Sequence, residues 1–396
     1  MLQETISKDL RRFRFRANPD YELVLLDCFS ENEQKLMAGL SRDPECYGVL
    51  RPKTSKLTIK AVSRDTALLF FTLEQPKPLP QYLENMLGHK FNDAIAQMVL
   101  DGILQIEVDG CMLCGPAAHA QIAAGGTIES ARNAVAALSV RALQYAEKLQ
   151  LDDAAVLANR LYLYNSTPAS ASWRSLLQDA TAVRRYLGIG TGPGSAVLDR
   201  LWTRIDPESS KAPWIAWAGP QQEALNHPAT TYKLYISPAP AELPRVFQAT
   251  AEVIAHSHSI HVKVGSDVHG LLRPDKMVAY FTRLDDLHET AERLIGRLLP
   301  CAAQGVPFTS EIAGDGLLSW GADPPTDSTT VPWLKRQSWR FWITNRLAAA
   351  LVYGRCSLDE DISGWKFALD RLRLDGINPE TWAPSDSLTR AQSNWG

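Results

Sequence analysis

Several features that would assign this chain to a class at once are missing from its sequence. No apolar run approaches the ~20 residues of a membrane span, so we expect no membrane-spanning segment. The formal net charge is -3 and the isoelectric point is near 6.3, which leaves no basic excess for binding nucleic acid or an anionic membrane. Met1–Arg16 is basic but has no apolar core, so we predict no secretory signal and a cytoplasmic protein.

Cysteine and nucleotide motifs are also scarce. Of six cysteines, only Cys111 and Cys114 have the spacing of a metal or redox pair. A structural zinc needs about four ligands and no second pair follows, so we favour ordinary reduced thiols. Gly188–Gly194 lacks the Lys-Ser/Thr of a phosphate loop and has no apolar strand before it, which favours a mobile connector. We therefore expect neither a metal nor a cofactor.

The length indicates more than one domain. At 396 residues, with 45% hydrophobic and 21% charged residues, the chain can bury a sizeable core. Because residues 202–220 are rich in Trp and Pro, we place a boundary there. Residues 1–220 are predicted to form a mainly helical domain that binds a peptide or partner, and residues 221–396 an α+β domain.

One hairpin in the first domain has a clear sequence signal. Phe91–Leu100 carries apolar residues at helical spacing, and Leu104–Val108 and Cys111–Leu113 flank the turn dipeptide Asp109-Gly110. A helix followed by a hairpin resembles a winged-helix unit, although a hairpin that simply caps a helical domain fits equally well. Residues 66–73 are expected to form a strand.

The second domain is predicted from alternating strands and amphipathic helices. Strands are expected at 232–237, 260–264 and 276–281, with helices at 242–256 and 285–298. This β-α-β-β-α order gives an antiparallel or mixed sheet with its helices on one side. Trp-rich helices are expected to follow, around Trp320, Trp333, Trp339, Trp342, Trp365 and Trp382.

The three strands share an unusual polar face. Successive side chains on a strand point to opposite faces, so the alternation separates a polar set from an apolar one. The polar set is Lys233, Tyr235, His261, Lys263, Lys276 and Tyr280. The apolar set is Leu234, Ile236, Val262, Val264, Met277 and Phe281. Ammonium groups on one face repel each other unless an anion lies among them, which predicts a site that handles phosphate.

Such a face carries the residue types needed for an elimination. A phosphate ester has about -1.5 to -2 charge, and cations both bind it and stabilise it as a leaving group. A lysine among other cations has a lowered pKa and can act as a general base. A base, an acid and a phosphate clamp suffice to remove the proton α to an amide and expel phosphate from the β carbon.

These residues resemble a known family. In their order along the chain, Tyr232–Pro238, His261–Val264, Arg273 and Val278–Phe281 are similar to the phosphothreonine lyases among type III secretion effectors. The whole chain is more similar to HopA-type effector-like proteins in gene clusters for ribosomally made, modified peptides such as thioamitides and class V lanthipeptides. Further motifs carry that likeness, namely Leu161–Asn165, Gly305–Thr309, Leu318–Pro325 and the Trp-rich end.

The resemblance implies an activity and partners. It implies phosphate elimination from phosphoserine or phosphothreonine in a precursor peptide, which gives dehydroalanine or dehydrobutyrine and works with a partner kinase. It implies Lys263 as the base, Lys233 as a supporting lysine, and Arg273 and Tyr280 as the phosphate clamp and its neighbour. Lys276 joins the phosphate-binding set by its place on the face. Arg336 and Arg340, four residues apart on one helical face, are candidates for further clamp arginines.

The sequence departs from the lyases at one position. Tyr235 stands where the lyases have a histidine as general acid. Either Tyr235 donates the proton, or His261 does, or phosphate leaves unprotonated with the help of cations alone. Two other interpretations stay open: a non-catalytic module that binds phosphopeptide and activates a kinase, and an effector-like toxin acting on host phosphoproteins.

Overall fold

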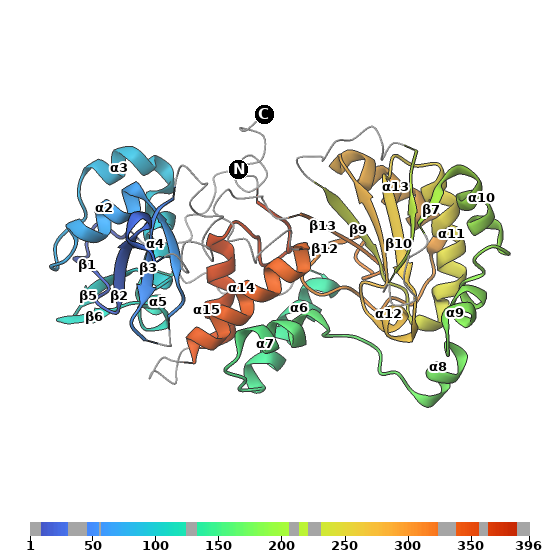
Figure 1. The fold of residues 1–396 in the computed structure, drawn as a ribbon, viewed down its shortest axis with the longest axis horizontal. Coiled ribbons are helices and arrows are strands. Elements are labelled where there is room, and N and C mark those ends of the chain that lie inside the picture. Colours follow the sequence, from blue (N-terminus) through green and yellow to red (C-terminus); the bar gives the residue numbers. More distant parts are fainter. Residues whose placement is uncertain are drawn as a thin grey trace.

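The computed structural model has a mixed α+β architecture, as predicted (Figure 1). The structure describes residues 9–30, 46–54, 57–123, 133–205, 214–220, 231–323, 338–355 and 363–385. Within these ranges, none of the helices combines the length and apolar character that crossing a bilayer requires.

Two small antiparallel sheets form the N-terminal unit. One has the order β1 (Phe15–Ala17), β5 (Leu104–Val108), β6 (Cys111–Leu113). The other has the order β2 (Tyr21–Leu25), β3 (Cys46–Pro52), β4 (Lys60–Ser63). The predicted hairpin is confirmed as β5–β6, and its turn residues Asp109 and Gly110 have φ values of 49° and 78°. Positive φ at both positions is the geometry that favours Asp-Gly in a two-residue turn.

Helices α2 (Arg64–Thr72), α3 (Tyr82–Leu87), α4 (Phe91–Leu100) and α5 (Pro116–Ile122) lie around these sheets. The next helices, α6 (Ala134–Lys148) and α7 (Ala154–Tyr162), pack with each other and with the C-terminal helices described below. The strand expected at 66–73 is wrong, because this segment is helix α2. Its N-cap Ser63 accepts a hydrogen bond from the Thr66 amide at 3.3 Å. The periodicity of a continuous apolar run does not distinguish a strand from a buried helix, and here the N-cap at Ser63 stabilises the helix.

A seven-stranded antiparallel sheet forms the second half, with the order β12-β13-β9-β11-β10-β8-β7. Its strands are β7 (Thr203–Ile205), β8 (Trp214–Ala218), β9 (Tyr232–Ile236), β10 (His261–Gly265), β11 (Met277–Phe281), β12 (Ser310–Ile312) and β13 (Leu318–Ala322). The helices with it are α8 (Ala171–Leu176), α9 (Ala180–Leu187), α10 (Pro193–Leu201), α11 (Leu243–Ala255), α12 (Val268–Leu272) and α13 (Leu284–Leu298). The three predicted strands are confirmed within one residue at each end, as are the two predicted helices α11 and α13.

One face of this sheet is apolar and covered by helices, as predicted. Every member of the predicted apolar set, from Leu234 to Phe281, is buried in a core that also contains side chains of α11 and α13. Figure 1 shows α9, α10 and α11 gathered on one side of the sheet, and α13 packs against α11. The opposite face is therefore the one that carries the polar set.

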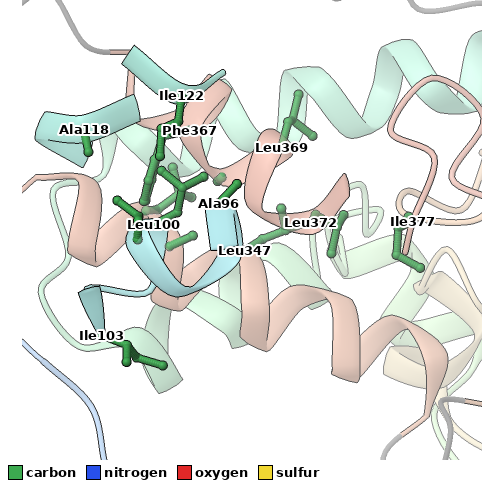
Figure 2. Close-up of a cluster of buried hydrophobic side chains, with 14 of the residues drawn as sticks. Ala96, Leu100, Ile103, Ala118, Ile122, Leu347, Phe367, Leu369, Leu372 and Ile377 are labelled. Carbon is green, nitrogen blue, oxygen red and sulfur yellow. The ribbon is translucent and has the colours of Figure 1, made fainter. Parts of the chain in front are cut away.

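The hydrophobic cores do not divide the chain at the predicted boundary near residue 220. The strands β7 and β8 and the helices α9 and α10 precede that boundary, yet they belong to the second core and its sheet. Conversely, α14 (Trp339–Gly354) and α15 (Gly364–Leu374) return to pack with α4 and α5 in the first core (Figure 2). Figure 1 shows these two helices between the N-terminal unit and the large sheet. A composition shift cannot reveal such a return of the chain.

The glycine-rich segment 188–194 joins α9 to α10 and is closed by a glutamine. The Gln248 side chain accepts hydrogen bonds from the Gly194 and Ser195 amides at 2.9 and 3.0 Å. It also donates to the Leu187 carbonyl at 2.6 Å. A Cβ at Gly194 would lie 1.9 Å from the Gln248 carbonyl oxygen, so glycine lets α10 approach α11 closely. These amides are engaged by the protein itself.

The cysteine pair lies on the hairpin. Cys111 is an exposed free thiol, and Cys114 is half-buried with its sulfur 4.0 Å from the Tyr353 hydroxyl. Burial raises the pKa of the Cys114 thiol. In the part of the chain that the structure describes, no three His, Cys, Asp or Glu side chains gather where they could hold a metal ion.

Candidate active site

The polar side chains of β9, β10 and β11 share one face because of the pairing register. Tyr280 pairs with Lys233 on one side and with His261 on the other. Val278 likewise pairs with Tyr235 and with Lys263. Directly paired residues project to the same face, so the amines of Lys233 and Lys263 lie on one side of the sheet, with β11 between them.

The two amines lie over the same aromatic ring. The Nζ atoms of Lys233 and Lys263 are 5.5 and 5.3 Å from the ring centroid of Tyr280. Lys263 also lies 4.3 Å from the ring of Trp214, which β8 presents on the same face. An aromatic face attracts a cation, so these rings hold the amines close together without neutralising them.

Lys263 is in a position to be a base. Its amine has no hydrogen-bond partner among the described residues, and its side chain is only half-buried. Burial and the neighbouring Lys233 ammonium lower the pKa of Lys263 to about 8, although Asp275 acts in the opposite direction. Since both burial and a like charge disfavour the protonated amine, about a tenth of the amine is neutral one pH unit below that pKa, far more than for an ordinary lysine.

Arg273 is delivered by a short helix that packs tightly on β10. A Cβ on Gly265, the last residue of β10, would lie 2.4 Å from the Gly270 carbonyl carbon, so α12 approaches as closely as it does only because glycine is there. Asp267 is the N-cap of this helix, and its side chain accepts a hydrogen bond from the Gly270 amide at 2.6 Å. Arg273 follows as its C-cap, with its guanidinium 5.4 Å from the Trp214 ring.

Asp275 joins the arginines of the site. Arg273 donates to both of its carboxylate oxygens, at 2.9 and 2.8 Å, and Arg340 lies 3.0 Å away. The Tyr162 hydroxyl at the end of α7 donates to it at 3.0 Å. Although burial raises the pKa of Asp275, Arg340 and Arg273 hold it at about 2, so the carboxylate stays charged.

Arg340 reaches this cluster from the first turn of α14. A Cβ on Gly321 of β13 would lie 2.3 Å from the Trp339 ring, so glycine allows α14 to sit against the sheet. The Arg340 side chain is 1% exposed and donates to the carbonyls of Tyr162 and Pro307 at 2.6 and 3.2 Å. This burial makes Arg340 a support of the site rather than an open ligand group. Arg336 lies outside the described residues.

A second carboxylate pairs with Lys233. The Lys233 amine donates to Asp323, the residue that follows β13. The lysine side chain is 8% exposed and the aspartate 35% exposed, so the pair is open on the aspartate side. The face is therefore less cationic than its lysines and arginines alone indicate.

The phenols and the imidazole remain uncharged near neutral pH. Burial, with a smaller contribution from Asp323, raises the pKa of Tyr280. Burial raises the pKa of Tyr235 well above its usual value, although Arg340 opposes it. Burial and the Lys263 ammonium lower the pKa of His261 to about 4. The His261 ring packs edge-on against Tyr280, with centroids 5.1 Å apart.

Lys276 does not join the other lysines, contrary to its assignment as a phosphate-binding residue. It precedes β11, is 0% exposed, and donates to the Pro238 carbonyl and the Gln304 side chain at 2.8 and 2.5 Å. Burial lowers its pKa to about 7. The alternation gave its face correctly but could not show that a loop closes over that end of the strand.

Sequence reasoning missed four members of this cluster, Tyr162, Trp214, Asp275 and Asp323. Tyr162 lies in Leu161–Asn165 and Asp323 lies in Leu318–Pro325. Both motifs carried the family resemblance, so the sequence could have indicated these two residues as members of the site. Asp275 is two residues from Arg273, which makes it a natural partner. Trp214 carried no signal beyond the Trp-rich composition of its segment.

Comparisons with known proteins yield faint structural likenesses. No protein-family profile matches the chain, and no curated protein does. An effector protein from Pseudomonas syringae pv. tomato strain DC3000 is 12% identical over 63% of this chain and 98% of its own, with a TM-score of 0.37. One from Pseudomonas syringae pv. syringae strain 61 is 14% identical over 65% of this chain and 98% of its own, also with a TM-score of 0.37. The phosphothreonine lyase effector VirA (SpvC) of Chromobacterium violaceum is 12% identical over 38% of this chain and 86% of its own, with a TM-score of 0.28. Likenesses of this size assign no activity to the chain.

Proposed function

We propose that this protein is a phosphoserine or phosphothreonine lyase that eliminates phosphate from a phosphorylated peptide. The observation that carries the proposal is the state of Lys263, a half-buried amine with a pKa lowered to about 8 and no hydrogen-bond partner among the described residues. It lies beside the cations Lys233 and Arg273, whose charges contribute to lowering its pKa. A neutral amine next to fixed cations is what base-promoted loss of a dianion requires.

In the proposed step, Lys263 takes the proton from the α carbon of the phosphorylated residue. The electron pair of the C–H bond forms a double bond between the α and β carbons, and the bond from the β carbon to the phosphate oxygen breaks. Inorganic phosphate leaves without a proton, held by the neighbouring cations, and takes up a proton from water; a dehydroamino acid remains in the peptide. Lys263 ends the step as an ammonium group and returns its proton to water.

Phosphate is held by Lys233 and Arg273 in this proposal. Both cations already have carboxylate partners, Asp323 and Asp275. The carboxylates fix the direction of each cation, and a phosphate with two negative charges competes for the donors that remain. Arg340, buried behind Asp275, fixes that carboxylate in turn. Lys276 has no part in the proposed site, because its amine is used by Pro238 and Gln304.

The protonation states of His261 and Tyr235 help to choose among the three routes by which phosphate could leave: with a proton from Tyr235, with a proton from His261, or without a proton. With a pKa of about 4, His261 is neutral and carries no acidic proton to give near neutral pH. Tyr235 keeps its proton but, with a raised pKa, is a weak acid. These states favour departure of phosphate as an anion carried by Lys233 and Arg273, with Tyr235 donating a hydrogen bond rather than a proton.

We further propose the biological setting implied by the family resemblance. The substrate is then a ribosomally made precursor peptide, phosphorylated by a partner kinase in the cytoplasm and converted to dehydroalanine or dehydrobutyrine. What supports this setting is the set of motifs along the chain, from Leu161–Asn165 to the Trp-rich end.

Mass spectrometry of a synthetic phosphothreonine peptide tests the activity. The wild-type protein is expected to remove one phosphoric acid unit per phosphorylated residue. Lys263→Met should lower the rate by about 10²–10⁴-fold, the usual contribution of a general base. Lys148→Met, a change at an exposed lysine on α6, should leave the rate unchanged. Full turnover by Lys263→Met would exclude the proposed base.

A specific observation also favours a second candidate, a phosphopeptide-binding module that activates a kinase. Tyr235 replaces the acid of the lyases, and Arg273 and Arg340 are both engaged by Asp275. The synthetic phosphothreonine peptide distinguishes the lyase from the binding module. Binding measured by fluorescence anisotropy without any mass loss favours the module, and mass loss with wild-type protein favours the lyase.

A further inference from the structure

One buried lysine is not used by the proposed chemistry. Lys276 is 0% exposed, and its amine donates to the Pro238 carbonyl and to the Gln304 side chain at 2.8 and 2.5 Å. Burying an amine disfavours its charged form, and burial lowers the pKa of Lys276 to about 7. A methionine of similar length would fill the same space without that cost. What the amine adds to packing is a pair of hydrogen bonds to two separate loops.

The Gln304 side chain uses both ends of its amide. Its Oε1 accepts from Lys276, and its Nε2 donates to the carbonyls of Asn165 and Leu272 at 2.5 and 3.2 Å. A carbonyl oxygen can only accept, so the partners fix which end of the amide faces which way. One side chain thus joins three points of the chain that are far apart in sequence.

Each of these three points adjoins a residue of the cluster around Asp275. In chain order they are Asn165 close after Tyr162, Leu272 directly before Arg273, and Lys276 directly after Asp275. Within the cluster, the Tyr162 hydroxyl donates to Asp275 at 3.0 Å and accepts from Arg273 at 3.1 Å. The side chains of the cluster are bonded to each other, while the residues beside them are held by the Lys276–Gln304 pair.

Asn165 strengthens the connection from its own side. Its Nδ2 donates to the carbonyls of Gln304 and Gly305 at 2.6 and 3.1 Å. Its φ of 69° lies in the left-handed region, which asparagine tolerates better than most residues. These contacts bring together Leu161–Asn165 and Gly305–Thr309, two motifs of the sequence for which the proposed reaction by itself gives no reason. They also join the end of α7 to a loop of the second half.

The loop after β9 holds the same segment from another side. The Ser237 hydroxyl, which is buried, donates to the Pro274 carbonyl at 2.7 Å, and the Ser237 carbonyl accepts from the Gln304 amide at 2.8 Å. Residues 272–276 are therefore bonded at several points to buried groups. Arg273, in the middle of this segment, has little freedom to turn away from Asp275.

We propose that Lys276 and Gln304 are positioning residues for the phosphate clamp. They fix the segment that carries Arg273 and Asp275 relative to Tyr162, so the Arg273 guanidinium is oriented before phosphate arrives. This inference rests on the proposed function, because it takes Arg273 to hold phosphate. It gives a role to two residues that act through Arg273 rather than by contact with phosphate.

Orientation in advance matters for an arginine. A long side chain that is free to rotate loses that freedom on binding, whereas a fixed one does not. A misplacement of about 1 Å, caused by a change away from the reacting atoms, can lower a rate by about a hundredfold. The Lys276–Gln304 pair should therefore affect both phosphate affinity and elimination without taking part in proton transfer.

Chemical modification of Arg273 by phenylglyoxal tests the positioning without any use of elimination. In the wild type Arg273 is held by Asp275, so it should react slowly. Lys276→Met removes the amine, and Gln304→Glu keeps an acceptor for Lys276 but removes the donor. Both variants are expected to raise the rate at Arg273 severalfold. Peptide mass spectrometry measures that rate, with Arg283, whose side chain is 69% exposed, as the internal reference.

Kinetics and phosphate binding test the consequence for the site. Lys276→Met and Gln304→Glu should each lower kcat/KM for a short phosphothreonine peptide by about 10–100-fold. They should also weaken the binding of inorganic phosphate, measured by calorimetry. Lys148→Met and Gln178→Glu, the matched changes at exposed residues, should leave both quantities unchanged. A general loss of stability would lower Tm, but it would not alter phosphate affinity or Arg273 modification well below Tm.

The outcomes separate this inference from the lyase activity itself. Equal rates of Arg273 modification in the wild type and both variants would overturn the inference, whatever the elimination assay gives. Wild-type protein that removes no phosphate would overturn the lyase, and the modification rates would still decide whether the pair positions Arg273. If Lys276→Met does not fold, Gln304→Glu alone gives the same decision.

Discussion

At the residue scale, a single lysine is set apart by its surroundings. The amine of Lys263 is close to two aromatic rings and two cations, and no described residue accepts a hydrogen bond from it. Lys233 lies on the same face of the sheet, but its amine is held in an ion pair with Asp323. Because Lys233 has a carboxylate partner and Lys263 has none among the described residues, Lys233 suits the role of a fixed positive charge and Lys263 that of a base that gains and loses a proton.

The pH dependence of elimination follows from this difference. In the proposed elimination Lys263 acts unprotonated, and its pKa is about 8, so activity should rise with pH and level off above that value. One pH unit below the pKa, about a tenth of the amine is neutral, so the rate at pH ~7 should be about a tenth of the plateau. The phosphate group titrates near pH ~6 and gives a separate, lower step.

The variant Asp323→Asn tests whether the pKa of Lys263 sets the pH dependence. The Asp323 carboxylate raises the pKa of Lys263, so its removal should move the rise in activity to lower pH. Initial rates measured between about pH 6 and 9 give the midpoint for both proteins. A profile without any rise near pH ~8 in the wild type would contradict Lys263 as the base.

At the scale of elements, glycines set how closely two helices approach the large sheet. Gly265 lets α12 pack on β10, and Gly321 lets Trp339 of α14 pack on β13. Each helix carries an arginine of the site, Arg273 at the end of α12 and Arg340 in the first turn of α14. The distance between these arginines and Asp275 therefore depends on two close contacts that any side chain would disturb.

Gly321→Ala is expected to damage both stability and activity. The added Cβ would lie 2.3 Å from the Trp339 ring, and this overpacking should cost about 1–3 kcal/mol of unfolding free energy. Displacement of α14 would also move Arg340 away from Asp275 and lower the elimination rate. Gly296→Ala is the control, since its Cβ would meet nothing within 4 Å in helix α13. Urea unfolding and initial rates measure the two effects, and equal behaviour of both variants would refute the role of Gly321.

At the scale of the whole molecule, two cores are built from interleaved stretches of chain. The first core combines the N-terminal unit, α6 and α7 with α14 and α15, and the second core lies between them in sequence. The candidate site lies where the two cores meet, because Tyr162 and Arg340 come from helices of the first core and Asp275 comes from the second half of the chain. Packing in each core thus affects the site.

Substitutions in the two cores should loosen different parts of the chain. Phe367 and Ile254 are both 0% exposed, one in each core, and their replacement by alanine should cost about 2–5 kcal/mol. Hydrogen exchange followed by mass spectrometry is expected to rise in α4, α14 and α15 for Phe367→Ala, and in β9–β11 for Ile254→Ala. The same exchange pattern in both variants would show that the two cores open as one unit.

Local patterns in the sequence determined β9, β10 and β11, their two faces and the hairpin, because alternation and turn chemistry are properties of a few consecutive residues. They identified Lys233, Lys263 and Tyr280 as members of one face, which the pairing of β9, β10 and β11 bears out. The helix at 64–72 was missed, since an apolar run alone does not distinguish a strand from a buried helix. Trp320, expected in a helix, lies in strand β13, which the sequence did not predict.

Tertiary structure alone decided how the charges of that face are compensated. Asp275 meets Tyr162 and Arg340, residues far from it along the chain, and Asp323 reaches Lys233 only because β13 pairs with β9. The burial of Lys276 and the return of α14 and α15 to the first core are likewise results of packing. The physical reason is that desolvation and charge pairing depend on which atoms surround a side chain in space, and sequence neighbours supply few of those atoms.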